Sequence, residues 1–331
     1  MKGMKVTVPE ELKKDVPQNS FGKILAATPV VMAVVATMLA GLASSEMTKA
    51  QYDRSLAAQQ QSKAGDQWSF FQAKRLRGAY QRNTADLVQN MTEVHQVDEA
   101  AIKALARQVP DDNKTKTELM SLLNSADGDR AIDLLRKGKL PDAAAEDAAE
   151  GHFVDGNLQK ALDEVQTFDS DTEVAAALAN VNEKELDDAV RYARGRADAF
   201  DKATAPANQA IDKLENLLLQ VAAAAPKGQG SVSRDVTAAR LKYAALRYET
   251  EARLNQSVAA LYELQVRKSN LSAERHHRRS QKFFFGMLGA QLAVIISTFA
   301  MAARQKNLLW SLAAVAGLLA IIFAVIVYLT M

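Results

Sequence analysis

Three long stretches of this sequence contain no charged residue, and they constrain the fold more than any other feature. They are residues 24–43, 283–303 and 308–331, which are 20, 21 and 24 residues long. About 20 apolar residues at a rise of roughly 1.5 Å each cover a hydrocarbon core roughly 30 Å thick. A buried helix of a soluble protein would normally carry some polar residue over such a length. We therefore predict an all-α membrane protein with three transmembrane helices.

The first apolar stretch has an alternative interpretation as a cleaved signal peptide. Residues 40–44 (Ala-Gly-Leu-Ala-Ser) are small enough for cleavage, but the polar leader and the apolar core are both longer than in typical signal peptides. We expect an uncleaved transmembrane helix at 23–45 after a polar tail at 1–22. The other transmembrane helices are expected at 283–303 and 308–331, joined by a short basic loop at 304–307.

Two segments between the first and second apolar stretches have apolar residues at helical spacing. They are residues 46–96 and 231–282, in which apolar positions recur in steps of three and four. One segment leaves the membrane and the other returns to it. We therefore predict a long antiparallel helical hairpin that forms a coiled-coil stalk. The positions expected to pack in this stalk include Leu76, Tyr80, Leu254, Val258 and Leu261.

The outgoing segment also contains an aromatic cluster, in a chain with only 6% aromatic residues. Trp68, Phe70 and Phe71 lie within four residues and precede a basic run at 74–77. At equal distances from the membrane, Trp68 is opposite Val258. We expect the three aromatic side chains to hold the hairpin together by packing near Leu254, Val258, Leu261 or Tyr262. Aromatic residues beside basic ones can bind nucleic acids, but the proximity of the membrane leads us to expect no nucleic-acid partner.

The middle of the chain, residues 97–230, is predicted to be an inserted acidic helical domain. Residues 97–229 contain 26 acidic and 16 basic residues, a net charge of −10 in a chain that carries +2 overall. The basic residues are therefore concentrated toward the two ends, as expected where a chain flanks a lipid bilayer. Breakers near 110, 125–129, 138–142, 151–156, 168–172, 204–206 and 226–230 divide this middle segment into helices. One break is expected at 204–206, between helices at 183–200 and 207–224.

A basic cluster directly precedes the second apolar stretch. It comprises Arg275, His276, His277, Arg278, Arg279 and Lys282. We expect these residues to contact lipid headgroups, because basic side chains favour anionic membrane surfaces. Adjacent residues of a helix point about 100° apart, so the two histidines are poorly placed to bind one metal ion. A proton- or metal-sensing role is the alternative for this cluster.

The sequence contains no recognisable catalytic or cofactor motif. There is no cysteine, and we find no glycine-rich phosphate loop, serine nucleophile elbow or zinc-binding His-Glu-x-x-His motif. The acidic residues at 127–129 lack the glycine and glutamate of a calcium loop. The predicted transmembrane helices contain no ionisable residue, which argues against an ion-coupled transporter. We therefore expect no enzymatic activity and no cofactor.

Residues 61–74 (Gln-Ser-Lys-Ala-Gly-Asp-Gln-Trp-Ser-Phe-Phe-Gln-Ala-Lys) follow the first apolar stretch, residues 274–277 (Glu-Arg-His-His) precede the second, and Trp310 opens the third. In these features the chain resembles a family of bacterial membrane proteins with a domain of unknown function, DUF4337. The resemblance covers about 22–95 and 240–331, so the acidic middle is expected to be an insertion. Because this family carries no established activity, the resemblance implies an architecture and no catalytic residue.

These features favour a structural or interaction protein of the bacterial inner membrane. We expect a self-associating scaffold or an accessory subunit of a larger membrane assembly, with the lipid bilayer and other membrane-complex subunits as partners. The lysine-rich tail before the first stretch favours a periplasmic stalk, with a cytoplasmic stalk as the alternative. Two other functions are a ligand-sensing helical bundle that acts through a partner, and an enzyme with its site in the acidic segment.

Overall fold

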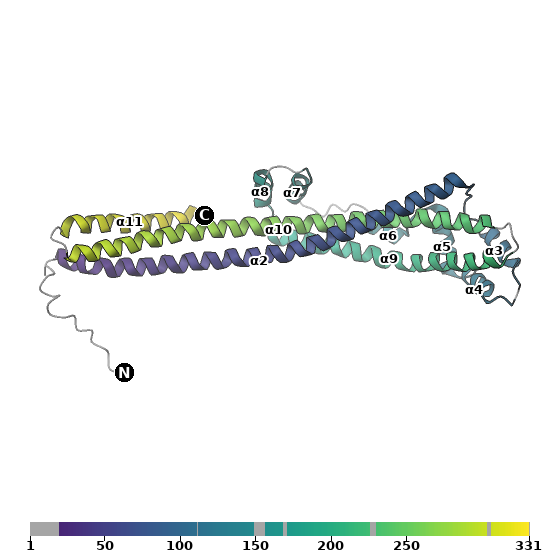
Figure 1. The fold of residues 1–331 in the computed structure, drawn as a ribbon, viewed down its shortest axis with the longest axis horizontal. Coiled ribbons are helices and arrows are strands. Elements are labelled where there is room, and N and C mark those ends of the chain that lie inside the picture. Colours follow the sequence, from purple (N-terminus) through teal and green to yellow (C-terminus); the bar gives the residue numbers. More distant parts are fainter. Residues whose placement is uncertain are drawn as a thin grey trace, which may run out of the picture. The chain divides into compact units, whose positions relative to one another are not determined.

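The described part of the chain is entirely α-helical. The computed structural model describes residues 20–110, 112–148, 156–167, 171–225, 230–302 and 306–330. These residues form ten α-helices and no β-strand, which confirms the predicted all-α class (Figure 1). The four longest helices are α2 (Ser20–Met91), α9 (Glu183–Ala224), α10 (Gly230–Ala302) and α11 (Lys306–Thr330). The shorter helices are α3 (Glu99–Arg107), α4 (Lys114–Leu123), α5 (Ala126–Lys137), α6 (Asp142–Ala148), α7 (Gly156–Gln166) and α8 (Asp171–Ala179).

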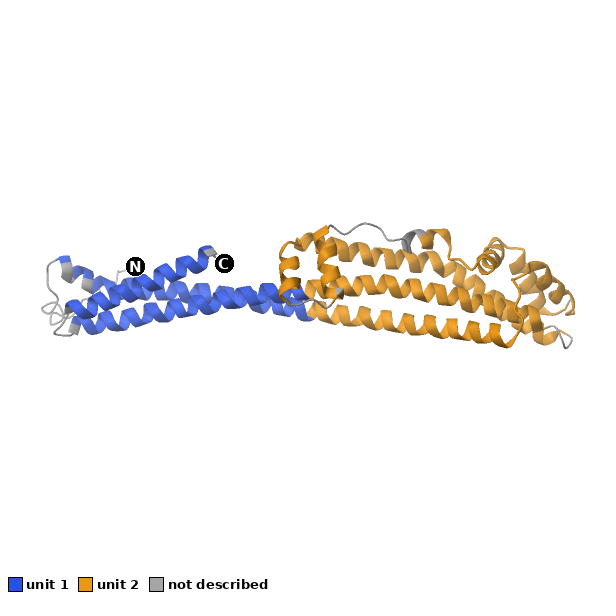
Figure 2. Cartoon of the chain, turned by 90° about the horizontal axis from the view of Figure 1, so that it is seen from above, with its two compact units in different colours: residues 1–58, 267–331 blue, residues 59–266 orange. Residues whose placement is uncertain are grey.

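The chain divides into two compact units, shown in different colours in Figure 2. Unit 1 contains residues 1–58 and 267–331, and unit 2 contains residues 59–266. Helices α2 and α10 each contribute residues to both units. The sequence boundary expected at residues 45 and 46 therefore coincides with no helix end, because α2 continues through it.

Unit 1 is built from α11 and from the parts of α2 and α10 that belong to it. All three helices contain a stretch that is long and apolar enough to cross a membrane, judged by length and composition. The Ser280 hydroxyl of α10 donates a hydrogen bond of 2.7 Å to the Ala43 carbonyl of α2. The Trp310 indole of α11 donates one of 3.1 Å to the Thr28 hydroxyl of α2. These bonds join all three helices of the unit.

Most of the buried apolar residues of α2 are small, with Leu39 as a large exception. Small buried residues lie at a spacing of seven at Ala36, Ala43, Ala50, Ala57 and Ala64, and again at Gly78 and Ala85, with the partly buried Phe71 at the position between. A Cβ atom added at Gly78 would lie 3.4 Å from the Tyr248 Cβ of α10. Small residues at an interface let two helix backbones approach closely, because interaxial distance depends on side-chain size.

The stripe of large apolar residues expected to form the seam of α2 lies on a different face. Leu76 and Tyr80 are 71% and 69% exposed within the chain, so the expectation that they face the returning helix is wrong. The physical reason is the alanine repeat, which already supplies a face that pairs with α10. Large side chains at helical spacing then remain outside the contact.

In unit 2, α9 is the helix on which four of the shorter helices pack, whereas α7 and α8 pack on each other. Helices α3, α4, α5 and α6 all contact it. The shared apolar core includes Ile102, Leu119, Ile132, Phe200 and Leu214, all nearly fully buried. The expected breaks near 110, 125 and 138 agree with observed helix ends. Gly138 caps α5 in the left-handed conformation, with φ 61°, where glycine carries no steric penalty. The expected breaks at 151–156, 168–172 and 226–230 fall largely outside the described residues.

The expected break at 204–206 is wrong, because α9 runs without interruption through Pro206. Proline removes one intrahelical hydrogen bond and usually kinks or ends a helix. Here Phe200, Ala207 and Ile211 are buried in the core on both sides of the proline, and Pro206 itself faces outward. Tertiary packing therefore outweighs the local cost of the lost bond.

Long-range polar contacts define the pairing of the long helices in unit 2. Asp212 and Glu215 of α9 pair with Arg240 of α10, whereas Asp187 of α9 accepts a hydrogen bond from Gln265. Later residues of α9 thus contact earlier residues of α10. The α2 helix contacts α10 through the Lys74–Glu251 and Arg82–Glu249 ion pairs.

Candidate functional site

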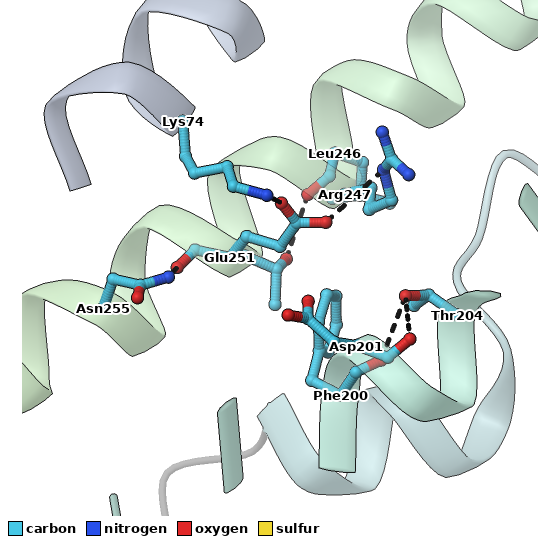
Figure 3. Close-up of polar contacts among 9 residues, drawn as sticks. Lys74, Phe200, Asp201, Thr204, Leu246, Arg247, Glu251 and Asn255 are labelled. Carbon is cyan, nitrogen blue, oxygen red and sulfur yellow. Dashed lines mark hydrogen bonds and ion pairs between the residues drawn. The ribbon is translucent and has the colours of Figure 1, made fainter. Parts of the chain in front are cut away.

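The most unusual polar group in unit 2 is Glu251, a carboxylate on the buried face of α10. Its side chain is only 6% exposed and forms an ion pair with Lys74 of α2 (Figure 3). The Arg247 Nε atom, one helical turn earlier, lies 3.5 Å from Glu251 Oε1. A buried carboxylate needs such partners, because burying an unpaired charge is very costly.

An aromatic ring completes the environment of the two cations. The Arg247 guanidinium lies 4.4 Å from the centre of the Tyr248 ring, and the Lys74 ammonium lies 5.6 Å from it. Both distances are within the range of cation–π attraction. Lys74, Arg247, Tyr248 and Glu251, which we call the polar layer, therefore link α2 to α10 by charge as well as by close packing.

Helix α9 adds a fourth charged residue, Asp201, beside the polar layer. Asp201 is exposed at the surface of α9, yet the partial burial of its carboxyl and the nearby negative charge of Glu251 raise its pKa above the usual value. Figure 3 shows Asp201 on the side of the layer opposite Lys74. The Thr204 hydroxyl donates to the carbonyl oxygens of Phe200 and Asp201, at 3.0 and 3.3 Å.

A cavity of about 90 Å³ lies next to the polar layer, between α2, α9 and α10. Three polar atoms of its lining are buried without a hydrogen-bond partner in the described part of the chain: Gln81 Oε1, Asn208 Oδ1 and the Tyr243 hydroxyl. Burial also raises the pKa of Tyr243 to about 12, against the opposing charge of Arg247. Buried polar atoms are almost always hydrogen-bonded, and this cavity is polar and large enough for water molecules. The arrangement suits bound water better than a larger organic ligand.

Unit 1 contains its own buried carboxylate, Glu46 of α2. Its Oε2 atom lies 2.6 Å from the His276 Nδ1 atom of α10, and Lys49 donates a hydrogen bond of 2.8 Å to Oε1. Burial by itself raises the pKa of Glu46, but the hydrogen bonds and charges of Lys49 and His276 outweigh it, so the pKa lies below its usual value. Glu46 is therefore ionised at neutral pH and binds α2 to α10.

The aromatic residues singled out in the sequence differ in their burial. The Trp68 and Phe71 rings form a T-shaped pair with centroids 5.5 Å apart, and both residues are partly buried. Phe70 is 54% exposed. Leu254, Val258 and Leu261 are all buried in unit 2. Direct packing of the aromatic pair on these three residues stays a prediction.

The basic cluster before the second apolar stretch is divided by its contacts. His276 pairs with Glu46, and Arg278 pairs with Glu274 on its own helix. The His277 Nε2 atom lies 3.0 Å from Gln281 Nε2, whereas its Nδ1 atom is buried and no described residue forms a hydrogen bond with it. Arg275 is exposed and Arg279 partly buried, and neither forms an ion pair within the described parts of the chain. Contact of this cluster with lipid headgroups stays a prediction.

Sequence reasoning missed Glu251 and Glu46 as organising residues. Glu251 lies three and seven positions before Leu254 and Val258, so it shares their apolar face. A carboxylate on such a face signals a buried ion pair. The alanine repeat of α2 is also visible in the sequence, but the predicted seam was based on the large apolar residues.

The described residues contain no group of three or more histidine, aspartate or glutamate side chains that could hold a metal ion. Asp127 and Asp129 belong to the first turn of α5, whose N-cap is Ser125. Carboxylates there favour the helix terminus electrostatically. The geometry around Glu251 and Glu46 is that of paired charges between helices, without a nucleophile beside a base.

These features define a class: an all-α protein in which three helices are long and apolar enough to cross a membrane, and in which buried ion pairs join the long helices. Residues 21–132 match the model of a family described as Domain of unknown function (DUF4337), so the chain resembles this family over that segment. Comparisons with curated proteins and with solved structures gave no match. The matched segment extends from α2 into α5. It therefore includes residues 97–132, which we had assigned to the insertion, and it does not include 240–331.

Proposed function

We propose that this chain is a membrane-anchored interaction protein, in which unit 1 forms a three-helix membrane anchor. The observation that carries the proposal is the distribution of side-chain size in unit 1. Exposed positions there are large and apolar, including Val34 and Met38 of α2, Leu292 and Phe299 of α10, and Leu318 of α11. Most buried positions are small, including Ala36, Ala290 and Ala320, although Leu39, Phe283 and Val327 are also buried. This pattern suits a lipid environment, where close backbone packing stabilises helix pairs.

The exposed apolar surfaces of α2 and α10 end at a common level. On α2 the last large exposed apolar residue of this belt is Leu42, and on α10 the first is Phe284. The hydrogen bond between Ser280 and Ala43 joins the two helices at this level. Beyond it lie Glu46, Lys49 and the basic cluster. Such an edge is expected at the boundary between hydrocarbon and headgroups.

We further propose that α2 and α10 form an antiparallel hairpin and that the outer face of α2 in unit 2 binds another copy of the chain. Leu76, Tyr80, Leu87 and Met91 are 57–73% exposed on this face. They recur at helical spacing, so they form one stripe. Contiguous apolar surface of this kind usually marks a protein interface. We propose a scaffold or accessory subunit without enzymatic activity.

The test is the size of the full-length chain in lipid nanodiscs or mild detergent, with co-purified proteins identified. The double variant Leu76→Gln with Tyr80→Gln should convert the oligomer to a monomer. A matched control replaces exposed residues of the same types on α9, Leu219→Gln with Tyr192→Gln, and should leave the size unchanged. A wild-type chain that is strictly monomeric and has no protein partner would overturn the proposed interaction.

We place the protein in the bacterial inner membrane, with residues 46–282 on the periplasmic side. The support is the short lysine-rich segment before the first apolar stretch, because positively charged short segments tend to stay in the cytoplasm. Reporter fusions after Gly228 test this orientation. Phosphatase activity of the fusion supports it, and fluorescence of a reporter that folds only in the cytoplasm contradicts it.

A further inference from the structure

We propose that a groove in unit 1 binds one anionic phospholipid, an inference that rests on the proposed membrane anchor. The groove lies between α2 and α10 and has a volume of about 620 Å³. That volume is within the range of sites that take a substantial part of a small molecule. All its lining residues belong to unit 1, so it is a feature of the anchor alone.

The lining of the groove is amphipathic in the direction expected for a lipid. Phe284, Phe285 and Met287 provide an apolar wall, and the two phenylalanine rings form a T-shaped pair. His277 and Gln281 line the groove one to two turns earlier in α10. The change from apolar to polar lining occurs at the level where the exposed apolar belt of unit 1 ends. An acyl chain against the aromatic wall would place its headgroup beside His277 and Gln281.

Charge selects an anionic headgroup for this groove. Residues 274–282 contain four basic residues and one acidic residue, a net charge of +3 with neutral histidines. Arg278 and Lys282 lie seven and three positions before Phe285, so they share its helix face. Arg278 pairs with Glu274 of its own helix, in an exposed position. Basic side chains beside a membrane attract anionic lipids, and a phosphate oxygen accepts hydrogen bonds from them.

A polar atom that lacks a partner lies in the same place. His277 lines the groove, and its Nδ1 atom is buried without a hydrogen-bond partner among the residues that the structure describes. Buried polar atoms without a partner are rare in proteins. The Gln281 amide lies 3.0 Å from Nε2, so in the tautomer with a proton on Nδ1 that amide donates to Nε2. A headgroup that enters the groove and turns the His277 ring out of its buried position would then supply the partner that Nδ1 lacks among the described residues.

The experiment uses the full-length chain and separates the lipid site from the anchor. Reconstitution into phosphatidylcholine vesicles and flotation test the anchor, because a protein without a membrane anchor stays at the bottom of the gradient. Thermal melting in detergent, with added phosphatidylglycerol or phosphatidylcholine of the same acyl chains, then tests the groove. Native mass spectrometry counts the retained lipids. We expect one phosphatidylglycerol to be retained with a roughly tenfold preference and to raise the Tm.

Two variants probe different parts of the groove. Ser44→Trp fills it from α2, and Arg278→Gln with Lys282→Gln removes charge without filling it. Both should abolish the preference for phosphatidylglycerol. The control Lys63→Gln with Arg77→Gln removes the same charge from exposed positions of α2 in unit 2 and should preserve it. Flotation together with equal retention of the two lipids would overturn the groove proposal while leaving the anchor intact. If Ser44→Trp changes the oligomer size and not lipid retention, a second copy occupies the groove and the proposal is wrong.

Discussion

The substitution Glu251→Gln removes the central charge of the polar layer and keeps the shape of the side chain. The Glu251 side chain is 6% exposed, and its partners Lys74 and Arg247 keep exposed fractions of 24% and 19%. In the variant both cations lose their carboxylate while remaining largely buried. We expect a loss of unfolding free energy of about 3 kcal/mol, at the lower end for a broken buried pair, because both cations retain some access to water.

A matched control lies two residues away on the same helix. Glu249 pairs with Arg82 of α2, but its side chain is 34% exposed and that of Arg82 is 58% exposed. Exposed ion pairs contribute about 0–1 kcal/mol and are screened by salt. Glu249→Gln therefore makes the same chemical change in an ion pair between the same two helices, and the two pairs differ in burial. Its effect on the unfolding free energy should be at most about 1 kcal/mol.

Thermal melting of the full-length variants in detergent at pH 7, monitored by circular dichroism, distinguishes Glu251→Gln from Glu249→Gln. At roughly 2–4 °C for each kcal/mol in a domain of this size, Glu251→Gln should lower the Tm by about 6–12 °C. Glu249→Gln should lower it by less than about 4 °C, and less still in high salt. Equal shifts in the two variants, or a wild-type Tm for Glu251→Gln, would show that burial of the pair does not determine its contribution.

Two further predictions concern a glycine in unit 2 and the titration of Asp201. A Cβ atom at Gly128 would lie 2.0 Å from the Leu122 carbonyl oxygen, whereas one at Gly195 in α9 would meet nothing within 4 Å. Gly128→Ala should therefore lower the free energy of unfolding by about 1–3 kcal/mol, and with it the Tm. Gly195→Ala should raise the free energy of unfolding by about 1 kcal/mol. An unchanged Tm for Gly128→Ala would contradict the close approach of α4 and α5. Because the folded-state pKa of Asp201 is raised, ionising this group costs stability as pH rises through that pKa. Asp201→Asn should melt above wild type at pH 7, and its advantage should shrink as pH falls and disappear below the ordinary aspartate pKa of about 3.9; an advantage that does not change with pH would refute this cause.

The all-helical class and the three apolar stretches could be predicted from the sequence because both depend on local composition. An uncharged run of 20 or more residues has few alternatives to a long helix, and α2, α10 and α11 contain those runs. Helix ends near 110, 125 and 138 could be predicted for the same reason, since Pro110, Ser125 and Gly138 affect the backbone conformation of their immediate neighbours. The continuity of α9 through Pro206 could not be predicted in this way, because it depends on the packing of Phe200 and Ile211 in a core that other helices complete.

The candidate site was largely hidden from the sequence. The cluster Trp68, Phe70 and Phe71 attracted attention as aromatic residues, but the charged contact between α2 and α10 in unit 2 is three residues further, at Lys74. Lys74 reads as part of an ordinary basic run, and its partner Glu251 is 177 residues away. Nothing local pairs two such residues until the helices are placed side by side.

The sequence by itself determined which segments are helical and which of them are apolar enough for a membrane, since hydropathy and helix propensity are properties of neighbouring residues. Tertiary structure alone decided which face of each helix is buried. On α2 that face is the alanine repeat, and the stripe with Leu76 and Tyr80 is left outside. The physical reason is that helix pairing depends on the fit of two surfaces. The small residues of α2 let α10 approach closely at Gly78, and Lys74 and Glu251 pair across this contact, an outcome that the period of one helix does not specify.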